Sequence, residues 1–543
     1  MVTMPSRTFR FPVSDWVAHH ALVRPNAIAL ASADTGEQVS WAQLEQRVGL
    51  AAAALLAHGL RPGDRIAVVA DNAPRAFVLQ FAAMRAGVVM VPLNWRLVTA
   101  EMRHQCIDAA VSALTHDATW AEPARDVADA AGVQTILELE TLTSAEPGNG
   151  LVPLPPQPHD PDAITHILYT SGTTGTPKGA LVSHASMMWN AFNILTAARV
   201  AAPDVNMLNP MPLFHAGGLN VLANPILMHG GQVTTMARWN PAAILAYIGD
   251  QTNGVTHLTT APSLLQTLVD DPTFGTTDFG TMRKIVLGGG TTTPQQLRAF
   301  AAKGVALHPQ YGGTETGPAA LVLEEGLERA LSGTCGKPVL HTAVRLVDPD
   351  SLTDVADDVV GEVWLKGPAV TPGYWNLPNE QYFVDGWFRT GDAARRDADG
   401  YFYIAGRYKD MYKSGGENVY AAEVENVLID LPEVAEAAII GVPDPKWGEV
   451  GLAVVVATPG ADVTLEGLQK ACAGRIARYK YPKHLDVVDA LPRNATGKVA
   501  KVALREHYHS AAVALRSPDR DSLATSSSHQ RESRCQSPLI EKC

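Results

Sequence analysis

The segment from Tyr169 to Gly179 contains the residue types that proteins use to hold phosphate groups. Glycine, serine and threonine fill it, Lys178 stands near its end, and an apolar stretch, 164–168, precedes it. Glycines let the backbone come close to a ligand and point N–H groups at it, hydroxyls add donors, and the lysine adds a mobile positive charge. The common P-loop ends in Gly-Lys-Ser/Thr, where this chain has Pro177-Lys178-Gly179. We therefore predict a nucleotide site that differs from those of kinases and motor ATPases.

Four further segments place charged, hydroxylic and glycine residues in a fixed order along the chain. They are Tyr311–Thr316 (YGGTET), Trp387–Asp392 (WFRTGD), Gly406–Asp410 (GRYKD) and Pro492–Lys498 (PRNATGK). Taken singly, a charged residue is usually a solvated surface group and a glycine cluster is usually a turn. Taken in order after 169–179, they resemble the signature of the adenylate-forming superfamily, which includes acyl-CoA synthetases, firefly luciferase and the adenylation domains of peptide synthetases. The resemblance spans nearly the whole chain except its two ends.

The resemblance implies a set of residues that bind ATP and Mg²⁺. Thr170 and Glu315 would hold the metal ion, and Lys498 would be the catalytic lysine. A lone histidine among apolar residues, such as His215, is ordinarily a satisfied core residue, but the resemblance places it at the acyl pocket, where it positions the carboxylate or thioester. The remaining nucleotide-binding candidates are Ser171, Gly172, Thr173, Thr174, Gly175, Lys178, Gly289, Gly290, Tyr311, Gly312, Thr314, Asp392 and Arg407.

A second half-reaction with coenzyme A is also implied by the resemblance. The thiol must approach from a side that Lys498 would obstruct, so the C-terminal part must rotate between the two steps. The resemblance makes Lys409 the hinge of that rotation. The candidates for the second step are Ser414, Gly415 and Gly416 in the pantetheine tunnel, and Lys446 and Trp447 near the CoA nucleotide.

These residue types suit the activation of a carboxylate. A carboxylate does not react with a thiol at neutral pH because oxide is a poor leaving group, and transfer of AMP creates a good one. The obstacle is electrostatic, since an anion must attack the α-phosphorus of polyanionic ATP, so catalysis should rest on positioning and charge neutralisation. The resemblance implies an AMP-forming acid–thiol ligase: acid and ATP give acyl-AMP and pyrophosphate, and CoA then gives acyl-CoA and AMP.

The acid itself stays open between a medium- or long-chain fatty acid and an aromatic acid of the hydroxycinnamate or ferulate kind. Apolar residues suggest the walls of its pocket, and no basic residue near them stands out as a partner for a second carboxylate. Three alternatives remain: a luciferase-type oxygenase, an acyl-AMP ligase that loads a carrier protein, and a catalytically inactive binding protein on the same fold. The expected walls are Trp189, Phe214, His215, Met228, Gly288 and Tyr311.

Composition excludes several classes of protein. The chain has 543 residues, 46% hydrophobic and 18% charged, which is typical of a well-packed globular protein with more than one domain. A net charge of −12 argues against a nucleic-acid partner. The five cysteines show no metal-binding spacing and are odd in number, no secretory leader is evident, and no apolar run is long enough to span a membrane. We expect a cytoplasmic protein without integral membrane contact. A homodimer is compatible with these features.

Alternating helical and strand-like patterns predict the fold. A helical pattern over 41–60, a buried strand over 65–70, a helix over 74–86 and a strand over 88–92 indicate an α/β domain with a largely parallel sheet. After Asp410 the pattern becomes a compact α+β unit. We therefore predict a large adenylation domain over 1–408, a smaller mobile α+β domain with Lys498 over 409–515, and a disordered tail over 516–543.

Overall fold

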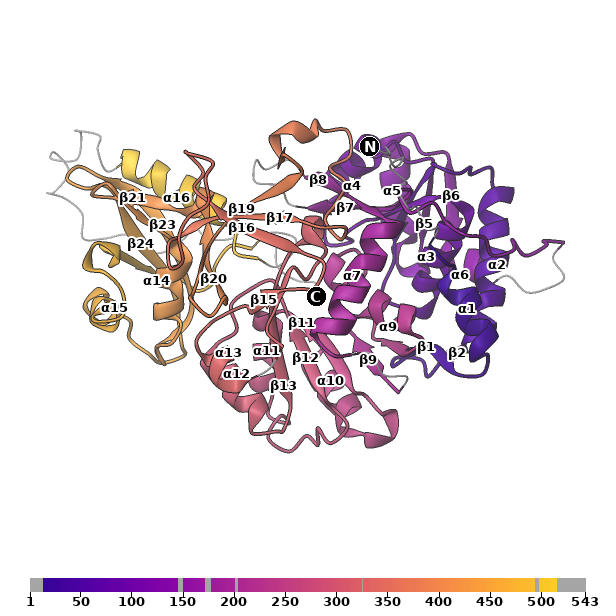
Figure 1. The fold of residues 1–543 in the computed structure, drawn as a ribbon, viewed down its shortest axis with the longest axis horizontal. Coiled ribbons are helices and arrows are strands. Elements are labelled where there is room, and N and C mark those ends of the chain that lie inside the picture. The colour runs from indigo at the N-terminus through magenta and orange to yellow at the C-terminus, as the bar shows by residue number, and fades with distance from the viewer. Residues whose placement is uncertain are drawn as a thin grey trace, which may run out of the picture.

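The computed structural model describes residues 13–144, 150–170, 177–200, 204–324, 326–493 and 498–514, with side chains up to residue 508. The predicted tail, 516–543, therefore lies outside the described residues. Four sheets organise the chain, two of them largely parallel and two largely antiparallel. Figure 1 shows the N-terminal helices and sheets on one side and the C-terminal sheet with α14 (Ala421–Leu428), α15 (Leu465–Cys472) and α16 (Lys501–Ala514) on the other.

A six-stranded sheet lies in the N-terminal part. Its order is β6-β5-β3-β4-β7-β8, and every neighbouring pair is parallel except β7 with β8. Because β7 ends at Thr170 and β8 begins at Lys178, the two ends of the phosphate segment lie at the same edge of this sheet. The strands are β3 (Arg65–Val69), β4 (Val89–Pro92), β5 (Ala113–His116), β6 (Thr135–Glu138), β7 (Ile164–Thr170) and β8 (Lys178–Ser183).

A nine-stranded sheet follows, in the order β15-β14-β13-β12-β11-β9-β10-β1-β2. The pairs from β13 to β1 are parallel, and the strands at both edges are antiparallel. The strands are β1 (Ile28–Ser32), β2 (Gln38–Ser40), β9 (Asn206–Asn209), β10 (Gln232–Thr235), β11 (His257–Thr260), β12 (Lys284–Leu287), β13 (Ala306–Tyr311), β14 (Leu321–Val322) and β15 (Lys337–Pro338).

Helices cover both faces of these two sheets, because strands buried on both sides need an apolar partner on each. One large core joins the two sheets through the helices between them, and two further cores cover their outer faces. Between the sheets lie α1 (Trp16–Val23), α2 (Trp41–Ala57), α3 (Pro74–Ala86), α6 (Leu139–Thr143), α7 (His184–Ala197), α8 (Ala216–Leu219) and α9 (Ala223–His229); outside them lie α4 (Thr99–Asp108), α5 (Ala121–Ala131), α10 (Pro241–Gly249), α11 (Pro262–Val269), α12 (Pro294–Ala301) and, at the edge, α13 (Leu327–Leu331).

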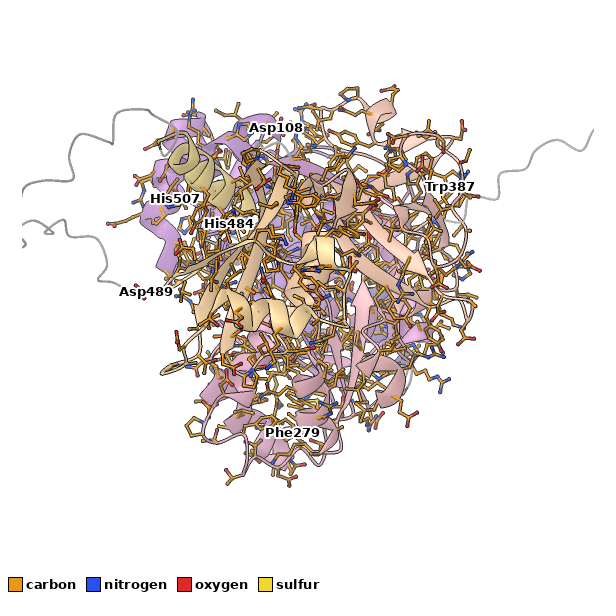
Figure 2. The ribbon with its side chains drawn as sticks, turned by 90° about the vertical axis from the view of Figure 1, so that its left-hand side faces the viewer. Asp108, Phe279, Trp387, His484, Asp489 and His507 are labelled. Carbon is orange, nitrogen blue, oxygen red and sulfur yellow. The ribbon has the colours of Figure 1, made fainter. Side chains whose placement is uncertain are left out.

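Two smaller sheets complete the chain. The third is antiparallel and consists of β16 (Ala343–Val347), β17 (Gly361–Lys366), β18 (Phe383–Val384), β19 (Trp387–Arg396) and β20 (Phe402–Arg407). The fourth consists of β21 (Tyr412–Ser414), β22 (Glu417–Val419), β23 (Val434–Asp444), β24 (Gly448–Ala457) and β25 (His484–Val487). Figure 2 shows the fourth sheet in front of the rest of the chain, with His484 and His507 on that part and Phe279 at the bottom of the view.

The predicted fold class is confirmed. The helix predicted over 74–86 is α3, with Pro74 at its first turn and Gly87 in the left-handed conformation after its end. The helix predicted over 41–60 ends earlier, at Ala57, but begins where expected because Ser40 and Gln43 form a capping box. A turn at Asp399-Gly400 joins β19 to β20, the strand pair that carries two of the site candidates.

A buried ion cluster joins the N-terminal segment to α2 and α3. The Arg85 side chain is fully buried, and its guanidinium donates to Asp15 at 2.8 Å and to both carboxylate oxygens of Glu45 at 2.9 and 2.6 Å. Removing one partner of a buried pair leaves an uncompensated charge. We expect Arg85→Met to lower the free energy of unfolding by about 3 to 5 kcal/mol, as measured by urea denaturation.

The matched control is Arg47→Met, which removes a half-exposed pair with Glu37. Exposed pairs contribute about 0 to 1 kcal/mol. Equal losses of stability in the two variants would contradict the importance of the buried cluster.

Candidate active site

The site candidates lie where strands end. Thr170 ends β7, Tyr311 ends β13, and His215 and Gly288–Gly290 follow β9 and β12. Because β9, β11, β12 and β13 are parallel neighbours, their carboxyl ends meet at one edge of the nine-stranded sheet. The third sheet adds Asp392 on β19 opposite Arg407 on β20, and α16 is preceded directly by Lys498.

Glu315 receives two hydroxyl donors at one carboxylate oxygen. Thr170 Oγ1 donates to Glu315 Oε1 at 3.1 Å, and the Tyr374 hydroxyl donates to the same atom at 2.9 Å. The backbone is held as well, since the Thr371 N–H donates to the Glu315 carbonyl at 2.7 Å. The burial of Tyr374 and its contact with Glu315 raise the pKa of its hydroxyl well above the ordinary value, so Tyr374 stays a neutral donor. The Glu315 carboxylate is therefore fixed in place.

This arrangement fits Mg²⁺. The ion prefers oxygen ligands and typically binds proteins through one or two carboxylates, with substrate phosphates and waters as its other ligands. Glu315 supplies such a carboxylate, and the described residues contain no cluster of three or more His, Cys, Asp or Glu that would form an all-protein metal cage. The donor set suits a metal ion that arrives with a nucleotide.

A second cluster surrounds Asp392. The Tyr311 hydroxyl donates to Asp392 Oδ2 at 2.7 Å, and Arg407 Nε lies 2.9 Å from Asp392 Oδ1. The Asp392 N–H donates to Thr390 Oγ1 at 3.1 Å. The nearby carboxylate raises the pKa of the Arg407 guanidinium, which stays charged. A fixed carboxylate beside a charged guanidinium offers an acceptor for sugar hydroxyls and a donor for phosphate oxygens.

Lys498 lies within electrostatic range of both clusters. Although the residue is exposed, desolvation by the surrounding protein lowers the pKa of its ammonium; the charge of Arg407 adds to this, and Asp392 and Glu315 oppose it. Burial lowers the pKa of His215 to about 4, and the positive charge of Lys498 contributes. At neutral pH the site therefore presents a neutral imidazole beside a cation, which suits an incoming carboxylate.

Two glycines of the candidate set, Gly289 and Gly312, are required for different structural reasons. Gly289 has φ +83° and no heavy atom within 4 Å of an added Cβ, so the chain leaves open space there, as a nucleotide-binding position requires. An added Cβ on Gly312 would lie 2.5 Å from the Pro318 carbonyl oxygen. Gly312 is therefore demanded by backbone packing, whether or not it also contacts a nucleotide. Gly290 is exposed beside Gly289, and Thr314 begins the short turn that carries Glu315.

The candidates for the thiol step form a separate group on the fourth sheet. The Gly415 N–H donates to the Trp447 carbonyl at 2.8 Å, and an added Cβ on Gly415 would lie 2.8 Å from the indole ring. Ser414 pairs with Gly448 across β21 and β24, Gly416 is open to solvent at φ +89°, and Lys446 Nζ lies 5.0 Å from the Trp447 ring centroid. In the described part of the chain, no hydrogen bond or ion pair joins this group to Glu315 or Asp392.

Some candidates fall outside these clusters. Ser171, Gly172, Thr173, Thr174 and Gly175 lie outside the described residues, as does 494–497. Lys409 is exposed in the turn Tyr408–Asp410 that links β20 to β21. Of the expected acyl walls, Met228 accepts a hydrogen bond from His20 through its carbonyl and Trp189 contacts His341. No hydrogen bond or ring contact within the described ranges joins either to His215 or Tyr311.

Sequence reasoning missed Arg96. Its guanidinium lies 4.3 Å from the Trp95 ring centroid and 5.5 Å from that of Phe214, and its charge contributes to the lowered pKa of His215. Arg238 flanks the same Trp95 ring at 4.9 Å. The position of Arg96 directly after the buried strand β4, at the carboxyl end of a parallel sheet, was the signal that could have indicated it.

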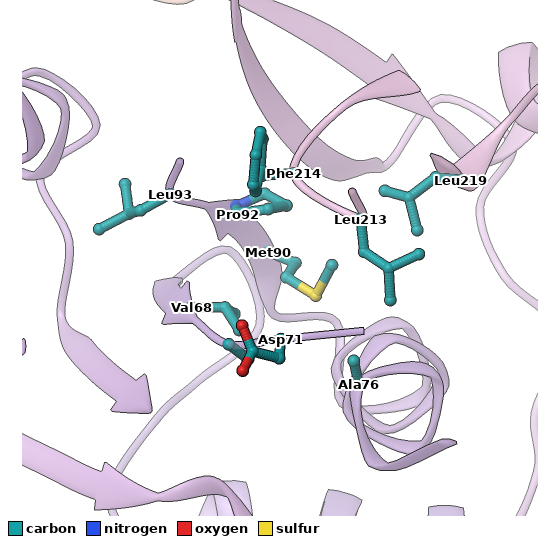
Figure 3. A pocket seen from close by; sticks show the side chains of 10 residues that line it. Val68, Asp71, Ala76, Met90, Pro92, Leu93, Leu213, Phe214 and Leu219 are labelled. Carbon is teal, nitrogen blue, oxygen red and sulfur yellow. The ribbon is translucent and has the colours of Figure 1, made fainter. Parts of the chain in front are cut away.

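An apolar cavity of about 20 Å³ lies beside Phe214 (Figure 3). Its volume holds roughly one water molecule, so it is too small for an acyl chain. Its lining comes from the carboxyl ends of β3 and β4, from α3, from α8 and from the loop that carries His215: Val68, Ala70, Asp71, Ala76, Met90, Pro92, Leu93, Leu213, Phe214 and Leu219.

Comparison with known proteins decides the family. The AMP-binding enzyme family matches residues 17–375, and the AMP-binding enzyme C-terminal domain matches 423–498. The chain belongs to the AMP-binding enzyme family. It is 36% identical over 498 residues to a feruloyl-CoA synthase of Amycolatopsis sp, covering 91% of this chain and 99% of that protein. It is 33% identical to a long-chain-fatty-acid–CoA ligase of Mycobacterium tuberculosis, covering 90% and 97%.

A solved relative of this AMP-binding enzyme contains the expected ligands. The o-succinylbenzoate coenzyme A synthetase of Bacillus subtilis, in complex with ATP and magnesium ion, has a TM-score of 0.80 and 29% identity and covers 91% of this chain and 100% of that one. The expected superfamily, the AMP-forming acid–CoA ligase class and the cofactors ATP, Mg²⁺ and CoA are thereby confirmed. No helix of the described residues has the length and apolar character that a membrane crossing requires.

The lowered pKa of Lys498 predicts the pH dependence of acyl-AMP formation. An ammonium is charged below its pKa, so activity that needs the charge falls as pH rises through that value. The pH dependence of kcat/KM reports the ionisations of the free enzyme. We expect kcat/KM to fall on the alkaline side with an apparent pKa below 10.5, the ordinary pKa of lysine. In Lys498→Arg, the activity that remains should fall only at higher pH, because a guanidinium stays charged.

Lys501→Arg is the matched control, since Lys501 begins α16, close to Lys498 in the chain, and pairs with Glu425 at 2.6 Å. That variant should leave the apparent pKa unchanged. An unchanged apparent pKa in Lys498→Arg would assign the titration to another group.

Proposed function

We propose that this enzyme joins an aromatic carboxylic acid of the hydroxycinnamate kind to CoA through an acyl-adenylate. The observation that carries the proposal is the convergence of Lys498, Asp392 and Glu315, from distant parts of the chain, on one site that also contains a neutral His215. The identity to feruloyl-CoA synthase supports the aromatic acid. A fatty acid is the second candidate, supported by the long-chain-fatty-acid–CoA ligase.

The first half-reaction follows from the charges of the site. Mg²⁺ held with Glu315 and Thr170 would neutralise charge on the phosphates of ATP. Lys178 and the segment 171–175 bind the departing pyrophosphate. Asp392, with Arg407 beside it, grips the ribose so that the α-phosphorus is held in line.

Lys498 and His215 act on the acid. The ammonium stabilises the negative charge that develops between carboxylate and phosphate, and it needs no proton transfer to do so. The neutral His215 orients the carboxylate without competing for it as a second cation. Positioning and charge neutralisation therefore account for the step, and no protein nucleophile is required.

The second half-reaction needs another arrangement of the C-terminal part. We place the domain boundary after residue 408, with an adenylation domain over 1–408 and a mobile domain over 409–515 that rotates about Lys409. Rotation withdraws Lys498 and brings the group of Gly415, Gly416 and Trp447 to the acyl-adenylate. The guanidiniums of Arg96 and Arg238, stacked on Trp95, suit the phosphates of the incoming CoA.

Two alternatives are less well supported. A carrier-protein ligase needs no CoA nucleotide site, whereas Lys446 stacks on Trp447 beside the glycine turn in this chain. An inactive binding protein has no use for Glu315 and Lys498 in one cluster. We further propose a cytoplasmic location, supported by three buried free cysteines, Cys106, Cys335 and Cys472. A homodimer stays a prediction.

A panel of fatty, benzoic and cinnamic acids, assayed for AMP release with and without CoA, tests the function. We expect AMP and acyl-CoA with a hydroxycinnamate, and far less AMP when CoA is omitted, because the adenylate then stays bound. A preference for a fatty acid would show that the substrate is a fatty acid and not an aromatic acid. Release of ADP, or no AMP with any acid, would refute the ligase mechanism.

Two substitutions should break opposite half-reactions. Lys498→Ala should lower acyl-AMP formation by about 100- to 1,000-fold, the usual effect of losing one charge-stabilising group, while thiolysis of supplied acyl-AMP continues. Gly416→Leu should do the reverse, because its side chain would enter the proposed tunnel. Stopped-flow measurement of the two half-reactions checks both.

The control for Gly416→Leu is Gly460→Leu. Gly460 is an exposed turn glycine of the same domain with φ +81° and free space around it, so the backbone strain is matched. If both leucine variants lose thiolysis equally, the tunnel assignment fails and strain explains the loss.

A further inference from the structure

The ammonium of Lys178 lies against two tyrosine rings. Its Nζ is 4.8 Å from the Tyr382 ring centroid and 5.7 Å from that of Tyr374. The two rings meet edge to face, with centroids 4.6 Å apart. A cation within about 6 Å of an aromatic face is attracted by the ring quadrupole. The pair Tyr374 and Tyr382, called the tyrosine pair below, therefore holds the only lysine of the phosphate segment in a defined place.

The tyrosine pair also reaches the metal-binding carboxylate. The Tyr374 hydroxyl donates to Glu315 Oε1 at 2.9 Å, beside the hydroxyl of Thr170. One side chain thus contacts both the lysine expected to bind pyrophosphate and the carboxylate expected to hold the divalent cation. The positions of Lys178 and Glu315 are coupled through Tyr374.

The segment that carries Tyr374 is fastened to β8, the strand that begins at Lys178. Thr371 Oγ1 donates to the Leu181 carbonyl at 2.7 Å, and the Trp375 N–H donates to the Gly179 carbonyl at 2.8 Å. Gly373 has φ +148°, a backbone conformation that side chains rarely adopt, so a side chain in the turn before Tyr374 would be strained. Backbone and side-chain bonds therefore fix the segment that carries Tyr374 to the strand that begins at Lys178.

Glu315 is the carboxylate that the tyrosine pair contacts. A lysine beside a carboxylate forms an ion pair, and such a pair would occupy the oxygen that a divalent cation needs. In the part of the chain that the structure describes, Lys178 has no ion pair. Aromatic rings attract the ammonium without an acidic group, so they hold it and leave the carboxylate available.

We propose that Tyr374 and Tyr382 are positioning residues that hold the Lys178 ammonium apart from Glu315, at the place where the phosphates of the nucleotide triphosphate bind. Aromatic faces leave the ammonium charged, so it meets the phosphates while the rings still hold it. The inference rests on the proposed function, because it assumes that Lys178 meets phosphate and Glu315 meets metal. It adds a role for residues that lie outside the sequence motifs.

Metal binding tests the proposal without any turnover. The full-length protein is titrated with Mn²⁺ in the presence of α,β-methylene ATP, a nucleotide that cannot transfer AMP, and bound Mn²⁺ is measured by electron paramagnetic resonance. Tyr382→Leu should weaken Mn²⁺ binding about 3- to 10-fold, the range expected for loss of one partly buried cation–π contact. Tyr382→Phe keeps the ring and should stay within about twofold.

A double-mutant cycle decides whether Tyr382 acts through Lys178. In the Lys178→Met background, Tyr382→Leu should have no further effect on Mn²⁺ affinity, because no ammonium remains to be held. A full effect in that background, or equal losses in the Leu and Phe variants, would overturn the proposal.

Tyr401→Leu is the matched control. The Tyr401 ring is also flanked by two cations, Arg329 at 4.2 Å and Lys337 at 4.4 Å, but it does not contact Glu315. Its loss should leave Mn²⁺ affinity unchanged; a matching loss would show a general stability effect and overturn the proposal. Because the titration uses no acid, failure of the wild type to form acyl-AMP would count against the proposed function alone.

Discussion

The site depends on the placement of one cation among opposing charges. Lys498 lies in the fields of two carboxylates, Asp392 and Glu315, and of a guanidinium, Arg407. The carboxylates favour its charged form, whereas the guanidinium and desolvation oppose it. A reaction between two anions needs such a cation near the bond that forms. A cation paired tightly with protein carboxylates could not stabilise the charge that develops on the substrates. The balance explains why each carboxylate has further partners of its own.

Those partners come from elements that the fold brings to one edge. Parallel strands direct their carboxyl ends to the same side, and loops from both large sheets meet there. The antiparallel pair β19 and β20 adds Asp392 opposite Arg407, a register in which an ion pair forms across the strands. Rigid strands hold the nucleotide-binding groups, while Lys498 arrives from the C-terminal part. This division suits a reaction in which only the cation must withdraw.

Aromatic rings perform a related task at two places. Tyr374 and Tyr382 flank Lys178, and Trp95 is flanked by Arg96 and Arg238. In both, cations lie against neutral aromatic faces, and Arg238 also pairs with Asp71 at 3.5 Å. A carboxylate partner would bind Lys178 more firmly and would have to be displaced by every incoming phosphate. Neutral partners keep the positive charge available, which agrees with the chain's need to attract polyanions despite a net charge of −12.

The sequence by itself determined the family, the α/β class, most element positions and a set of candidate reacting residues, because glycine-rich turns and chemically necessary side chains occur in ordered local motifs. Thr170, Glu315, Asp392, Arg407 and Lys498 could be named for that reason. Only the tertiary structure decided which of them meet and what holds them. Tyr374, Tyr382 and Arg96 make contacts with residues far along the chain, and local pattern carries no information on such distances. The same limit applies to Met228, which the sequence suggests for the acyl pocket by its type alone and whose place there stays a prediction.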